Sequence, residues 1–423
     1  MRILQLTPGT GNYYCGSCLR DNSLVRSLRA RGHDVLMVPL YLPHVTDEPS
    51  ESAGTPIFLG GISVFLEQKF PALRRMPGWL NRLLSSPALL RQCSRLAGMT
   101  SGSDLGESTV SMLAGAQSRQ AGEVERLVAW LRTQPRPDVI CLSNSLLSGL
   151  ARPLKQEFRA PIVCAMQGED SFLESLPEPY RRQSWDLLAQ RCADIDHFTP
   201  VSRYHGDLMC GRLGIPSERA TVLYPGLAFE TFPPAAPPAP PEPPVIGYLA
   251  RMNRGKGLAT LAEAFLQLGM PNVRLRIAGA STSQDERFVR SLRERLPGNV
   301  EFFPNLDHAA KHDFLRGLTL FSVPATYGEA FGLYLLEAWA AGVPVVQPRH
   351  GAFPELVEKT GGGLLCDPDD PAALAAALRR LLNDPALARR MGEAGRQAVA
   401  ADFNIDATTR KLETLLQHVT NAP

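Results

Sequence analysis

The stretch VPATYGEAFGLYLLEAWAAGVPVV, residues 323–346, holds the succession of elements that decides the fold. Its first residues end an apolar run and enter a loop, and a helix is predicted to begin near Phe331 or Gly332 and to continue to Gly342. The apolar run VPVV follows. Short apolar runs that alternate with helices are typical of a parallel sheet covered on both faces. The stretch therefore predicts an α/β fold.

Strand-like runs with helical segments between them continue this alternation through both halves of the chain. In the second half they are VIGYLA (245–250), VRLRIAG (273–279), VEFFP (300–304), LTLFSVP (318–324) and VPVVQP (343–348). In the first half they are residues 3–6, 35–40, 139–142, 162–166 and 197–201, with a helix predicted over 19–30. The sequence therefore predicts two doubly wound, Rossmann-like domains facing across a cleft, with ligands at the carboxyl ends of the strands.

A proline-rich segment, PPAAPPAPPEPP at residues 233–244, separates the two halves. Its eight prolines in twelve residues exclude helix and sheet and favour a stiff polyproline II linker. A surface loop within one domain is the alternative. The linker predicts a first domain at 1–232, with a helical insertion at about 64–130, and a second domain at 245–403. Residues 404–423 are predicted to form a helix that packs back on the first domain.

The composition is that of a globular protein, because 44% of the 423 residues are hydrophobic and 20% are charged. The formal net charge of +2 gives no reason to expect nucleic-acid binding. The N-terminal MRILQLTPGT is interpreted as a first strand rather than a signal peptide, and no run of about 18 apolar residues occurs. Eight scattered cysteines favour a reducing cytoplasm over a disulfide framework.

One segment, residues 68–99, is strongly basic and carries no acid. Leucines, Trp79 and methionines are interleaved with its cations, which are Lys69, Arg74, Arg75, Arg82, Arg91 and Arg95. Such a segment can lie on an anionic membrane surface. It can equally form a lid over a substrate site or a helical pair packed on the domain, and these alternatives stay open.

Two acids, Glu329 and Glu337, bracket the predicted start of the helix. The first N–H groups of a helix are unpaired, so residues 330–333 form an anion site, and Gly332 lets a ligand approach the backbone. Glu337 lies about five residues into the helix, roughly 7 Å along its axis. A diphosphate seated there would have a carboxylate at each end, one for a sugar and one for a ribose, as in a nucleotide-sugar. A capping acid with an ordinary helix-surface glutamate is the alternative.

The loop ARMNRGKG, which follows the strand 245–250, adds the cations Arg251, Arg254 and Lys256 ahead of a helix predicted to start near Leu258. Cations at the end of a strand and before a helix suit a bound phosphate. A basic loop that only faces solvent is the alternative, because such loops are common.

Four motifs occur in a fixed order in the second half: RMNRGKG, VPATYGEAFGLYLLEAWAAGVPVV, GAFPELV and GGGLLCDPDDPAALAAAL. Together they closely resemble the C-terminal donor domain of family 4 glycosyltransferases of the GT-B fold. TPGTGNYYCGSC, LRARGHDVLMV, VSRYHGDLM and VLYPGL resemble the N-terminal half, so the likeness covers nearly the whole chain apart from residues 44–130. The resemblance implies a retaining, metal-independent enzyme whose donor is a UDP- or GDP-sugar.

The resemblance also implies roles for individual residues. Arg251 and Lys256 would hold the diphosphate and stabilise the leaving group, and Glu329 would contact the sugar hydroxyls. Glu337 would bind the ribose. The remaining donor contacts would come from the backbone near the helix start and from the first glycine loop, at Phe331, Gly332, Leu333 and Gly16.

Two positions depart from the family pattern. Cys15-Gly16 stands where the family usually has Gly-Gly, and Gln167 stands where it usually has His. Glutamine can donate to a sugar hydroxyl but cannot take a proton, so a base at this position is in doubt. In retaining enzymes of this type the leaving phosphate is thought to deprotonate the acceptor. The predicted acceptor- or sugar-binding residues are Gln167 and Glu169, with Asp170 beside them; a loop and helix-cap role is the alternative.

Other classes of function remain open. A nucleotide-sugar epimerase or a phosphorylase has the same fold, a dinucleotide-binding redox protein could use Cys15 and Cys18, and a binding module could lack catalysis. No lysine is indicated for pyridoxal phosphate, and no strand is followed by a G-x-G-x-x-G loop.

Cys15-x-x-Cys18 is assigned to loop packing, and the pairs Asp194-x-Asp196 and Asp367-x-Asp369 are assigned structural roles rather than metal binding. The sequence does not identify the base, the sugar or the acceptor.

Overall fold

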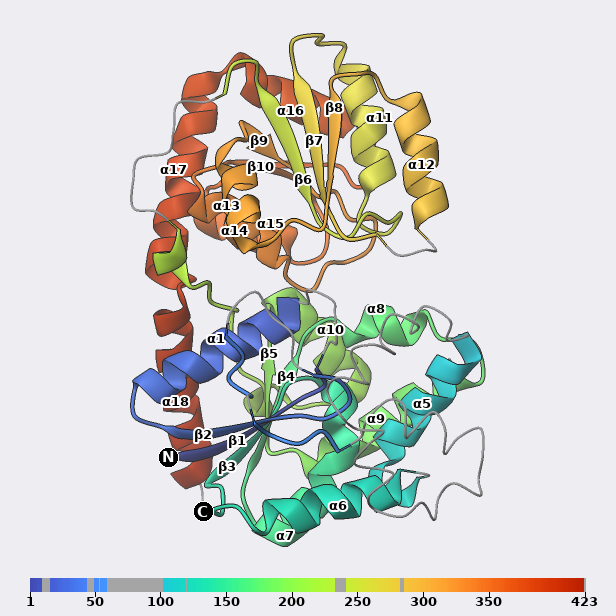
Figure 1. Ribbon diagram of the computed structural model, residues 1–423, viewed down its shortest axis with the longest axis vertical. Coiled ribbons are helices and arrows are strands. Elements are labelled where there is room, and N and C mark those ends of the chain that lie inside the picture. The colour runs from blue at the N-terminus through green and yellow to red at the C-terminus, as the bar shows by residue number, and fades with distance from the viewer. Residues whose placement is uncertain are drawn as a thin grey trace. The chain divides into compact units, whose positions relative to one another are not determined.

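The structure is a computed structural model, and it describes residues 1–9, 16–43, 49–52, 54–58, 102–118, 120–232, 241–281 and 285–421. This part of the chain forms two compact units (Figure 1). Unit 1 takes in residues 1–201, 205–224 and 408–423, and unit 2 takes in residues 202–204 and 225–407. Cys15, the basic segment 68–99 and residues 233–240 of the proline-rich segment lie outside the described residues, so the predictions made for them stay predictions.

Unit 1 is built on a parallel sheet with the strand order β2-β1-β3-β4-β5 in its described part. The strands are β1 (Arg2–Thr7), β2 (Asp34–Pro39), β3 (Val139–Leu142), β4 (Ile162–Met166) and β5 (His197–Pro200). Every residue of β3, β4 and β5 is buried. Helices cover both faces of a parallel sheet, which explains why these strands appear in the sequence as continuous apolar runs.

The described helices of unit 1 pack in pairs around this sheet. They are α1 (Gly16–Ala30), α5 (Gly102–Ala114), α6 (Ala121–Leu131), α7 (Ala151–Phe158), α8 (Glu169–Glu174), α9 (Tyr180–Arg191) and α10 (Arg203–Leu213), with short 3-10 turns η3 (Gly115–Gln117), η4 (Ser145–Leu150), η5 (Cys192–Asp194) and η6 (Ser217–Arg219). Helix α5 lies against α9, and α6 lies against α7 (Figure 1).

The last helix, α18 (Ile405–Asn421), is joined to unit 1 by polar contacts near the start of the chain. The Glu413 carboxylate lies 2.7 Å from the Arg31 guanidinium and 2.7 Å from the His33 ring. The Thr409 hydroxyl is hydrogen-bonded to the Ser27 hydroxyl at 2.9 Å, and both residues are buried. The hydrogen bond from Arg31 holds the pKa of Glu413 below its usual value, so the carboxylate is ionised in this contact.

Unit 2 has a second parallel sheet with the described strand order β11-β10-β9-β6-β7-β8. The strands are β6 (Val245–Leu249), β7 (Arg274–Gly279), β8 (Val300–Pro304), β9 (Leu320–Phe321), β10 (Val345–Pro348) and β11 (Gly363–Cys366). The described helices are α11 (Leu258–Leu268), α12 (Glu286–Arg295), α13 (His308–Arg316), α14 (Leu333–Ala340), α15 (Phe353–Thr360), α16 (Pro371–Asn383) and α17 (Pro385–Asp402), with the turn η7 (Phe229–Thr231).

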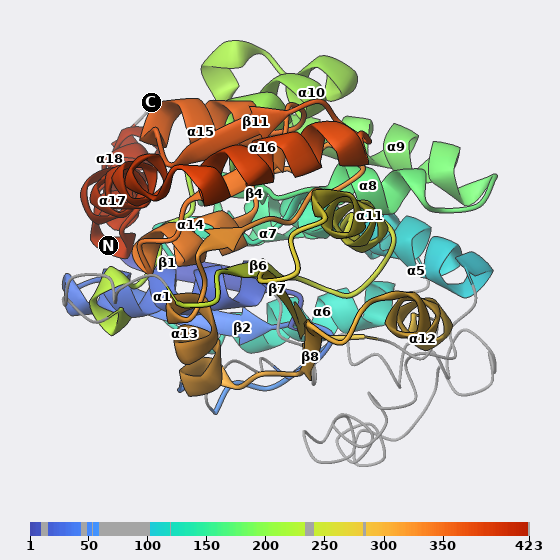
Figure 2. The same ribbon diagram turned by 90° about the horizontal axis from the view of Figure 1, so that it is seen from above.

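The core of unit 2 forms where its helices meet the sheet. Helix α11 lies beside α16 in both views (Figures 1 and 2), and α14 packs against α17. Trp339 of α14 is fully buried, and its indole N–H donates to the Gly362 carbonyl at 2.8 Å. Burying this large ring therefore leaves no unpaired polar atom on it. This packing fixes α14, the helix within the stretch 323–346.

The predicted α/β architecture is confirmed, with small differences in element boundaries. The strand predicted over 318–324 is only β9, Leu320–Phe321, although Ser322 N–H still donates to the Gly247 carbonyl at 2.9 Å. Strand β11 was not predicted, because its glycine-rich start hides the apolar run. The helix predicted from Phe331 or Gly332 begins at Leu333, since Gly332 has a left-handed backbone and cannot be helical.

Candidate functional site

The loop that follows β6 places Lys256 at the carboxyl edge of the unit 2 sheet. The Asn253 carboxamide oxygen accepts a hydrogen bond from the Lys256 backbone N–H at 2.8 Å, which closes a turn. The Thr326 N–H donates to the Gly255 carbonyl at 2.9 Å and ties this loop to the loop that follows the neighbouring strand β9. These two hydrogen bonds hold the loop in which Lys256 lies next to Glu329, 73 residues away in the chain.

Glu329 lies at the centre of a small polar cluster. Its Oε2 atom forms an ion pair with the Lys256 ammonium and accepts a hydrogen bond from the Tyr334 hydroxyl at 2.9 Å. Lys256 Nζ also lies 5.1 Å from the centre of the Tyr327 ring and 5.5 Å from the centre of the Tyr334 ring. The side chains of Lys256 and Glu329 are 20% and 13% exposed, so the ion pair is largely shielded from water.

The charge of Glu329 stabilises the charged form of Lys256 and the protonated form of the neighbouring tyrosines. Burial disfavours the charged form of Lys256, but the Glu329 carboxylate outweighs it and holds the pKa of the ammonium above its usual value. Burial and the same carboxylate raise the pKa of Tyr334 well above the usual range, and they also raise the pKa of Tyr327. Both phenols are therefore protonated at neutral pH, and Tyr334 acts as a hydrogen-bond donor.

Helix α14 begins directly after Gly332, whose backbone φ of +89° is left-handed. This conformation costs a residue with a side chain about 1–2 kcal/mol. A Cβ atom at this position would also lie 3.2 Å from the Phe353 ring and 3.3 Å from the Tyr334 ring. Glycine therefore keeps the backbone open at the helix start, where the first N–H groups have no partner within the helix.

Glu337, the second acid of the motif, also forms an ion pair with a lysine. Its Oε1 atom lies 2.8 Å from Lys311 Nζ, and both side chains are 15% exposed. Lys311 belongs to α13, whose first turn is capped by Asp307 through a hydrogen bond from the Ala310 N–H at 2.8 Å. The two acids that bracket the start of α14 are therefore each held by a different lysine.

Arg251 lies in the same loop as Lys256 but has a different partner. Its guanidinium contacts Asp285 Oδ2 through Nε at 3.2 Å and through Nη2 at 3.1 Å. The Arg251 side chain is 50% exposed, whereas that of Asp285 is 15% exposed. The Arg254 guanidinium lies over the Phe288 ring, 4.8 Å from its centre. Both arginines are thus directed to residues at or near the start of α12.

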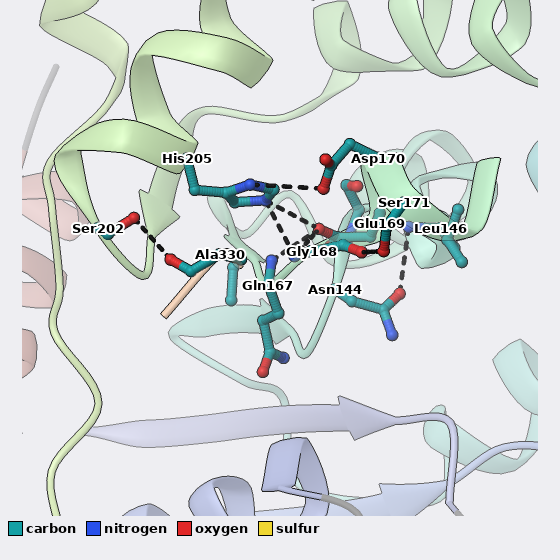
Figure 3. Close-up of polar contacts among 12 residues, drawn as sticks. Asn144, Leu146, Gln167, Gly168, Glu169, Asp170, Ser171, Ser202, His205 and Ala330 are labelled. Atoms are coloured by element: carbon teal, nitrogen blue, oxygen red, sulfur yellow. Dashed lines mark hydrogen bonds and ion pairs between the residues drawn. The ribbon is translucent and has the colours of Figure 1, made fainter. Parts of the chain in front are cut away.

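In unit 1, Glu169 lies nearly fully buried after β4 (Figure 3). Its Oε1 atom accepts a hydrogen bond from the Ser145 N–H at 2.8 Å. Its Oε2 atom accepts from the N–H groups of Gln167 at 2.6 Å and Gly168 at 3.0 Å. These N–H groups belong to the loops that follow β3 and β4. The carboxylate therefore ties two neighbouring loops together at the carboxyl edge of the sheet.

The fully buried His205 of α10 lies between two carboxylates (Figure 3). Its Nε2 atom is 3.4 Å from Glu169 Oε2, and its Nδ1 atom is 3.6 Å from Asp170 Oδ1. Burial opposes the ionisation of Glu169, but His205 and the backbone N–H groups outweigh it and hold the pKa of Glu169 below its usual value. For Asp170 burial dominates and raises the pKa.

Gln167 points away from the His205 ring (Figure 3). Its amide Nε2 donates to the Ser143 carbonyl at the end of β3. The Arg20 guanidinium reaches the same carbonyl at 3.4 Å and forms a buried ion pair with Asp21 at 2.5 Å. Arg20 and Asp21 lie on α1, whose first residue is the exposed Gly16. Gln167 and α1 therefore meet at the end of β3.

The GAFPELV motif caps the first two residues of α10, Arg203 and Tyr204, which belong to unit 2 although the rest of α10 belongs to unit 1. The Glu355 carboxylate accepts hydrogen bonds from the N–H groups of Arg203 at 3.0 Å and Tyr204 at 3.2 Å, at the start of α10. The Ser202 hydroxyl donates to the Ala330 carbonyl at 2.7 Å, directly beside Glu329 (Figure 3). These contacts hold the backbone of the EAFG segment.

The paired aspartates that could suggest a metal site have structural partners. Asp194 contacts Arg152 at 3.1 Å, and Asp196 accepts from Lys155 at 2.6 Å and from the Ile162 N–H at 2.8 Å. Over the described residues, no group of three or more His, Cys, Asp or Glu side chains is placed to hold a metal ion. In that same part of the chain, no helix is long and apolar enough to cross a membrane.

The predicted site residues are divided between the two units. Lys256, Glu329 and the start of α14 form one cluster in unit 2, whereas Gly16, Gln167 and Glu169 belong to unit 1. Glu169 is turned to the backbone and not to the surface, which favours the loop and helix-cap alternative for this residue. Sequence reasoning missed Tyr334, Lys311, Asp285 and His205. Tyr334 had a sequence signal as a phenol in the first turn of the motif helix, and His205 had one as part of VSRYHGDLM.

Two family models match the chain. "Glycosyl transferase 4-like domain" matches residues 21–226, and "Glycosyl transferases group 1" matches residues 231–398. Glycogen synthase of Mycobacterium tuberculosis is 30% identical over 273 residues, which are 64% of this chain and 66% of that protein. A putative colanic acid biosynthesis glycosyltransferase, WcaL of Escherichia coli, is 34% identical over 53% of this chain and 60% of its own length.

Solved structures agree on the fold. Sucrose-phosphate synthase from Thermosynechococcus elongatus superposes with a TM-score of 0.75 at 22% identity, and the alignment covers all of both chains. The Anabaena protein HepE, in complex with UDP-glucose, gives a TM-score of 0.67 at 18% identity over 99% of this chain and 100% of that one. At such identities the likeness establishes the fold alone.

These matches define the class as glycosyltransferases of the GT-B fold. The chain belongs to family 4 of that class, as its motifs and both family models indicate. The aligned regions span from about half to about two thirds of the length of the curated relatives.

Proposed function

We propose that the protein is a retaining glycosyltransferase that moves a sugar from a UDP- or GDP-sugar to an acceptor hydroxyl. The observation that carries this proposal is the arrangement of Glu329 and Glu337 around the start of α14, each held by its own lysine. A nucleoside diphosphate sugar has hydroxyl groups at both ends and negative charge in the middle. The site offers one carboxylate before α14 and one within it, together with cations and the N-terminus of that helix.

In this proposal unit 2 binds the donor. Glu337 accepts hydrogen bonds from the ribose hydroxyls, and Glu329 accepts from the sugar hydroxyls. The N–H groups near Phe331, Gly332 and Leu333 bind the sugar and the phosphates, and Gly16 of unit 1 approaches the phosphates. These assignments follow the family resemblance, and the location of Glu329 before α14 and of Glu337 at its fifth position supports them.

The positive charge needed by the leaving diphosphate comes from Lys256 and Arg251. Negative charge grows on the diphosphate as the bond to the sugar breaks, and groups that bind this charge more tightly than the ground state accelerate the reaction. The turn that Lys256 forms with Asn253, at the carboxyl edge of the sheet, supports this role. Since these cations and the helix N-terminus supply the charge, we propose that transfer needs no divalent metal.

On the acceptor side, Gln167 donates a hydrogen bond to a sugar or acceptor hydroxyl. It cannot take a proton, so the leaving phosphate takes the proton of the acceptor hydroxyl on the face where the new bond forms. Glu169 supports Gln167 rather than the substrate, because its carboxylate already accepts three backbone N–H groups.

Relatives support a nucleotide-sugar donor but differ in what they act on. One is described as a glycogen synthase, and another, from Corynebacterium glutamicum, as a GDP-mannose-dependent phosphatidylinositol monomannoside mannosyltransferase. HepE has been solved with UDP and with UDP-glucose. The acceptor classes proposed for this chain are therefore a glycan, a lipid or a small molecule. We infer a cytoplasmic location from the scattered cysteines.

Calorimetry with UDP, GDP and their sugars tests this proposal, with and without a chelator. Binding in the micromolar range that survives the chelator is expected, together with transfer of sugar to an acceptor mixture and retention at the anomeric carbon. Loss of binding in the chelator would overturn metal independence. Absence of binding for every nucleoside diphosphate would overturn the donor site.

A further inference from the structure

Tyr334 lies in the first turn of α14, and aromatic rings on other elements fix its side chain. Its ring centre is 6.1 Å from that of Phe321 in β9 and 6.5 Å from that of Phe353 in α15. Gly332 would bring a Cβ atom within 3.3 Å of the same ring if it carried one. A ring held on these sides has little rotational freedom, so the direction of its hydroxyl is set by the fold.

This hydroxyl is aimed at Glu329. It donates to Oε2 at 2.9 Å, the same oxygen that forms the ion pair with Lys256. Two donors on one oxygen give the carboxylate a single orientation. Tyr327 also shares side-chain hydrogen bonds with Glu329 and Lys256. A sugar hydroxyl that enters the cluster therefore meets a carboxylate that these donors already hold. An ionised carboxylate has no proton to give, so that hydroxyl must be the donor.

We propose that Tyr334 is a positioning residue that sets the orientation of the Glu329 carboxylate and so makes the donor site require a free hydroxyl on the transferred sugar. This inference rests on the proposed function, in which Glu329 faces the sugar. A sugar that lacks this hydroxyl, or carries it as an ether, would leave Glu329 without a partner on that side. Leaving a charged acceptor unpaired in a shielded site is costly, which is how a polar site rejects an analogue without the group.

Tyr334→Phe tests the proposal, because it removes the hydroxyl and keeps the ring and its packing. Calorimetric titrations would use UDP with UDP-glucose and GDP with GDP-mannose. The variant is expected to bind the free nucleoside diphosphate within about twofold of the wild type and the nucleotide-sugar about tenfold more weakly. Tyr180→Phe is the matched control, since it removes a tyrosine hydroxyl from the start of α9 in unit 1.

A double-mutant cycle with Glu329→Gln separates positioning from a general effect on folding. In the Glu329→Gln background, adding Tyr334→Phe is expected to change nucleotide-sugar binding less than twofold. A purely structural role of the hydroxyl would lower binding by the same factor in both backgrounds. Deoxy analogues of the bound nucleotide-sugar complete the test. The wild type is expected to bind one of them at least tenfold more weakly than the parent nucleotide-sugar. The Tyr334→Phe variant is expected to show a smaller difference between the two affinities.

Each outcome bears on one of the two claims. A wild type that binds neither nucleotides nor nucleotide-sugars overturns the proposed function and this inference with it. A wild type that binds both, beside a Tyr334→Phe variant with unchanged nucleotide-sugar affinity, overturns the role of Tyr334 alone. A Tyr334→Phe variant that loses the free nucleoside diphosphate as strongly as the nucleotide-sugar also overturns it. In that case the hydroxyl supports the helix start and not the carboxylate.

Discussion

Lys311 Nζ lies 2.8 Å from Glu337 Oε1, and the two side chains are equally shielded from solvent. The lysine comes from α13 and the acid from α14, so the pair also joins two helices of unit 2. A shielded charge that loses its partner is costly. Substitutions at Glu337 therefore act on Lys311 as well, and experiments on this acid need a variant in which both charges are removed.

Glu337→Gln should weaken the free nucleoside diphosphate and the nucleotide-sugar alike, because both contain the ribose. A lost acceptor costs on the order of 1–3 kcal/mol, which corresponds to a factor of about 5 to 150 in the dissociation constant. Titrations of the variant with the free nucleoside diphosphate and with the nucleotide-sugar measure the two dissociation constants. The double variant with Lys311→Met controls for the unpaired lysine. If only the nucleotide-sugar were weakened, Glu337 would not be the ribose ligand.

If Lys256 has the proposed role, Lys256→Met should lower kcat more than it lowers donor affinity, because the wild-type ammonium then stabilises charge that develops on the leaving diphosphate. A loss of roughly 100-fold in kcat with less than a tenfold change in donor affinity is expected. Arg251→Ala should act in the same direction but more weakly, since its guanidinium is half exposed and shared with Asp285. Steady-state kinetics and donor titrations measure both.

The control for these cations is Arg274→Ala, at the opposite end of the sheet. Arg274 begins β7, and its guanidinium lies 3.8 Å from the Glu301 carboxylate. Its removal should leave transfer unchanged. Equal losses of kcat and affinity at Lys256 would mean that this residue only binds the donor.

Glu169→Gln should destabilise the protein at neutral pH by about 1–3 kcal/mol, because an amide cannot accept all three backbone N–H groups. The pKa of Glu169 is lower in the folded protein than its usual value of 4.5. The stabilisation is therefore complete above about pH 4.5 and is lost as the pH falls through the lower folded value. Denaturant unfolding of wild type and variant, at neutral pH and below pH 4, should show the difference shrinking in acid.

Asp170→Asn is the matched control for this pH dependence. Burial raises the pKa of Asp170, so ionisation of this neighbouring acid opposes folding. Removing its charge should leave stability at neutral pH unchanged or slightly increased. A deficit in Glu169→Gln that is as large in acid as at neutral pH would show that the ionised carboxylate is not what holds the two loops.

Gly332→Ala should cost more than backbone strain alone, because the added methyl group meets the rings of Phe353 and Tyr334. Gly269→Ala provides the comparison: Gly269 has a similar left-handed φ of +61°, and no described atom lies within 4 Å of a Cβ built there. Both variants should lose about 1–2 kcal/mol of stability from strain. Only Gly332→Ala should also weaken donor binding, and thermal unfolding beside titration would show whether it does.

Much of the fold could be predicted because its signals are local. Apolar runs such as VIGYLA mark strands that are buried on both faces, and their alternation with helices fixes the parallel arrangement. Strand β11 was not predicted, because Gly361, Gly362 and Gly363 are followed by only three apolar residues and the run is too short to indicate a strand. The start of α14 could be placed only within two residues, since the sequence does not reveal that Gly332 is left-handed.

The partners of the site residues could not be predicted, because they come from distant parts of the chain. Lys256 and Glu329 were both identified, yet nothing in either motif indicates that they form an ion pair. Lys311 lies on an ordinary amphipathic helix and carries no motif. Glu169 was predicted near an acceptor, but its environment depends on Ser145 and His205, which other elements bring to it. Such contacts are products of the tertiary fold.

The confinement of Arg251, Lys256, Lys311, Glu329 and Glu337 to a single unit has an evolutionary consequence. If these residues bind the donor as proposed, they are inherited as one block while the loops of unit 1 change under selection for a new acceptor. A gene fusion that joined unit 2 to another first unit would carry its donor preference along. The segment to preserve in such a chimaera is 202–204, whose backbone N–H groups are capped by Glu355 and whose Ser202 holds the carbonyl beside Glu329.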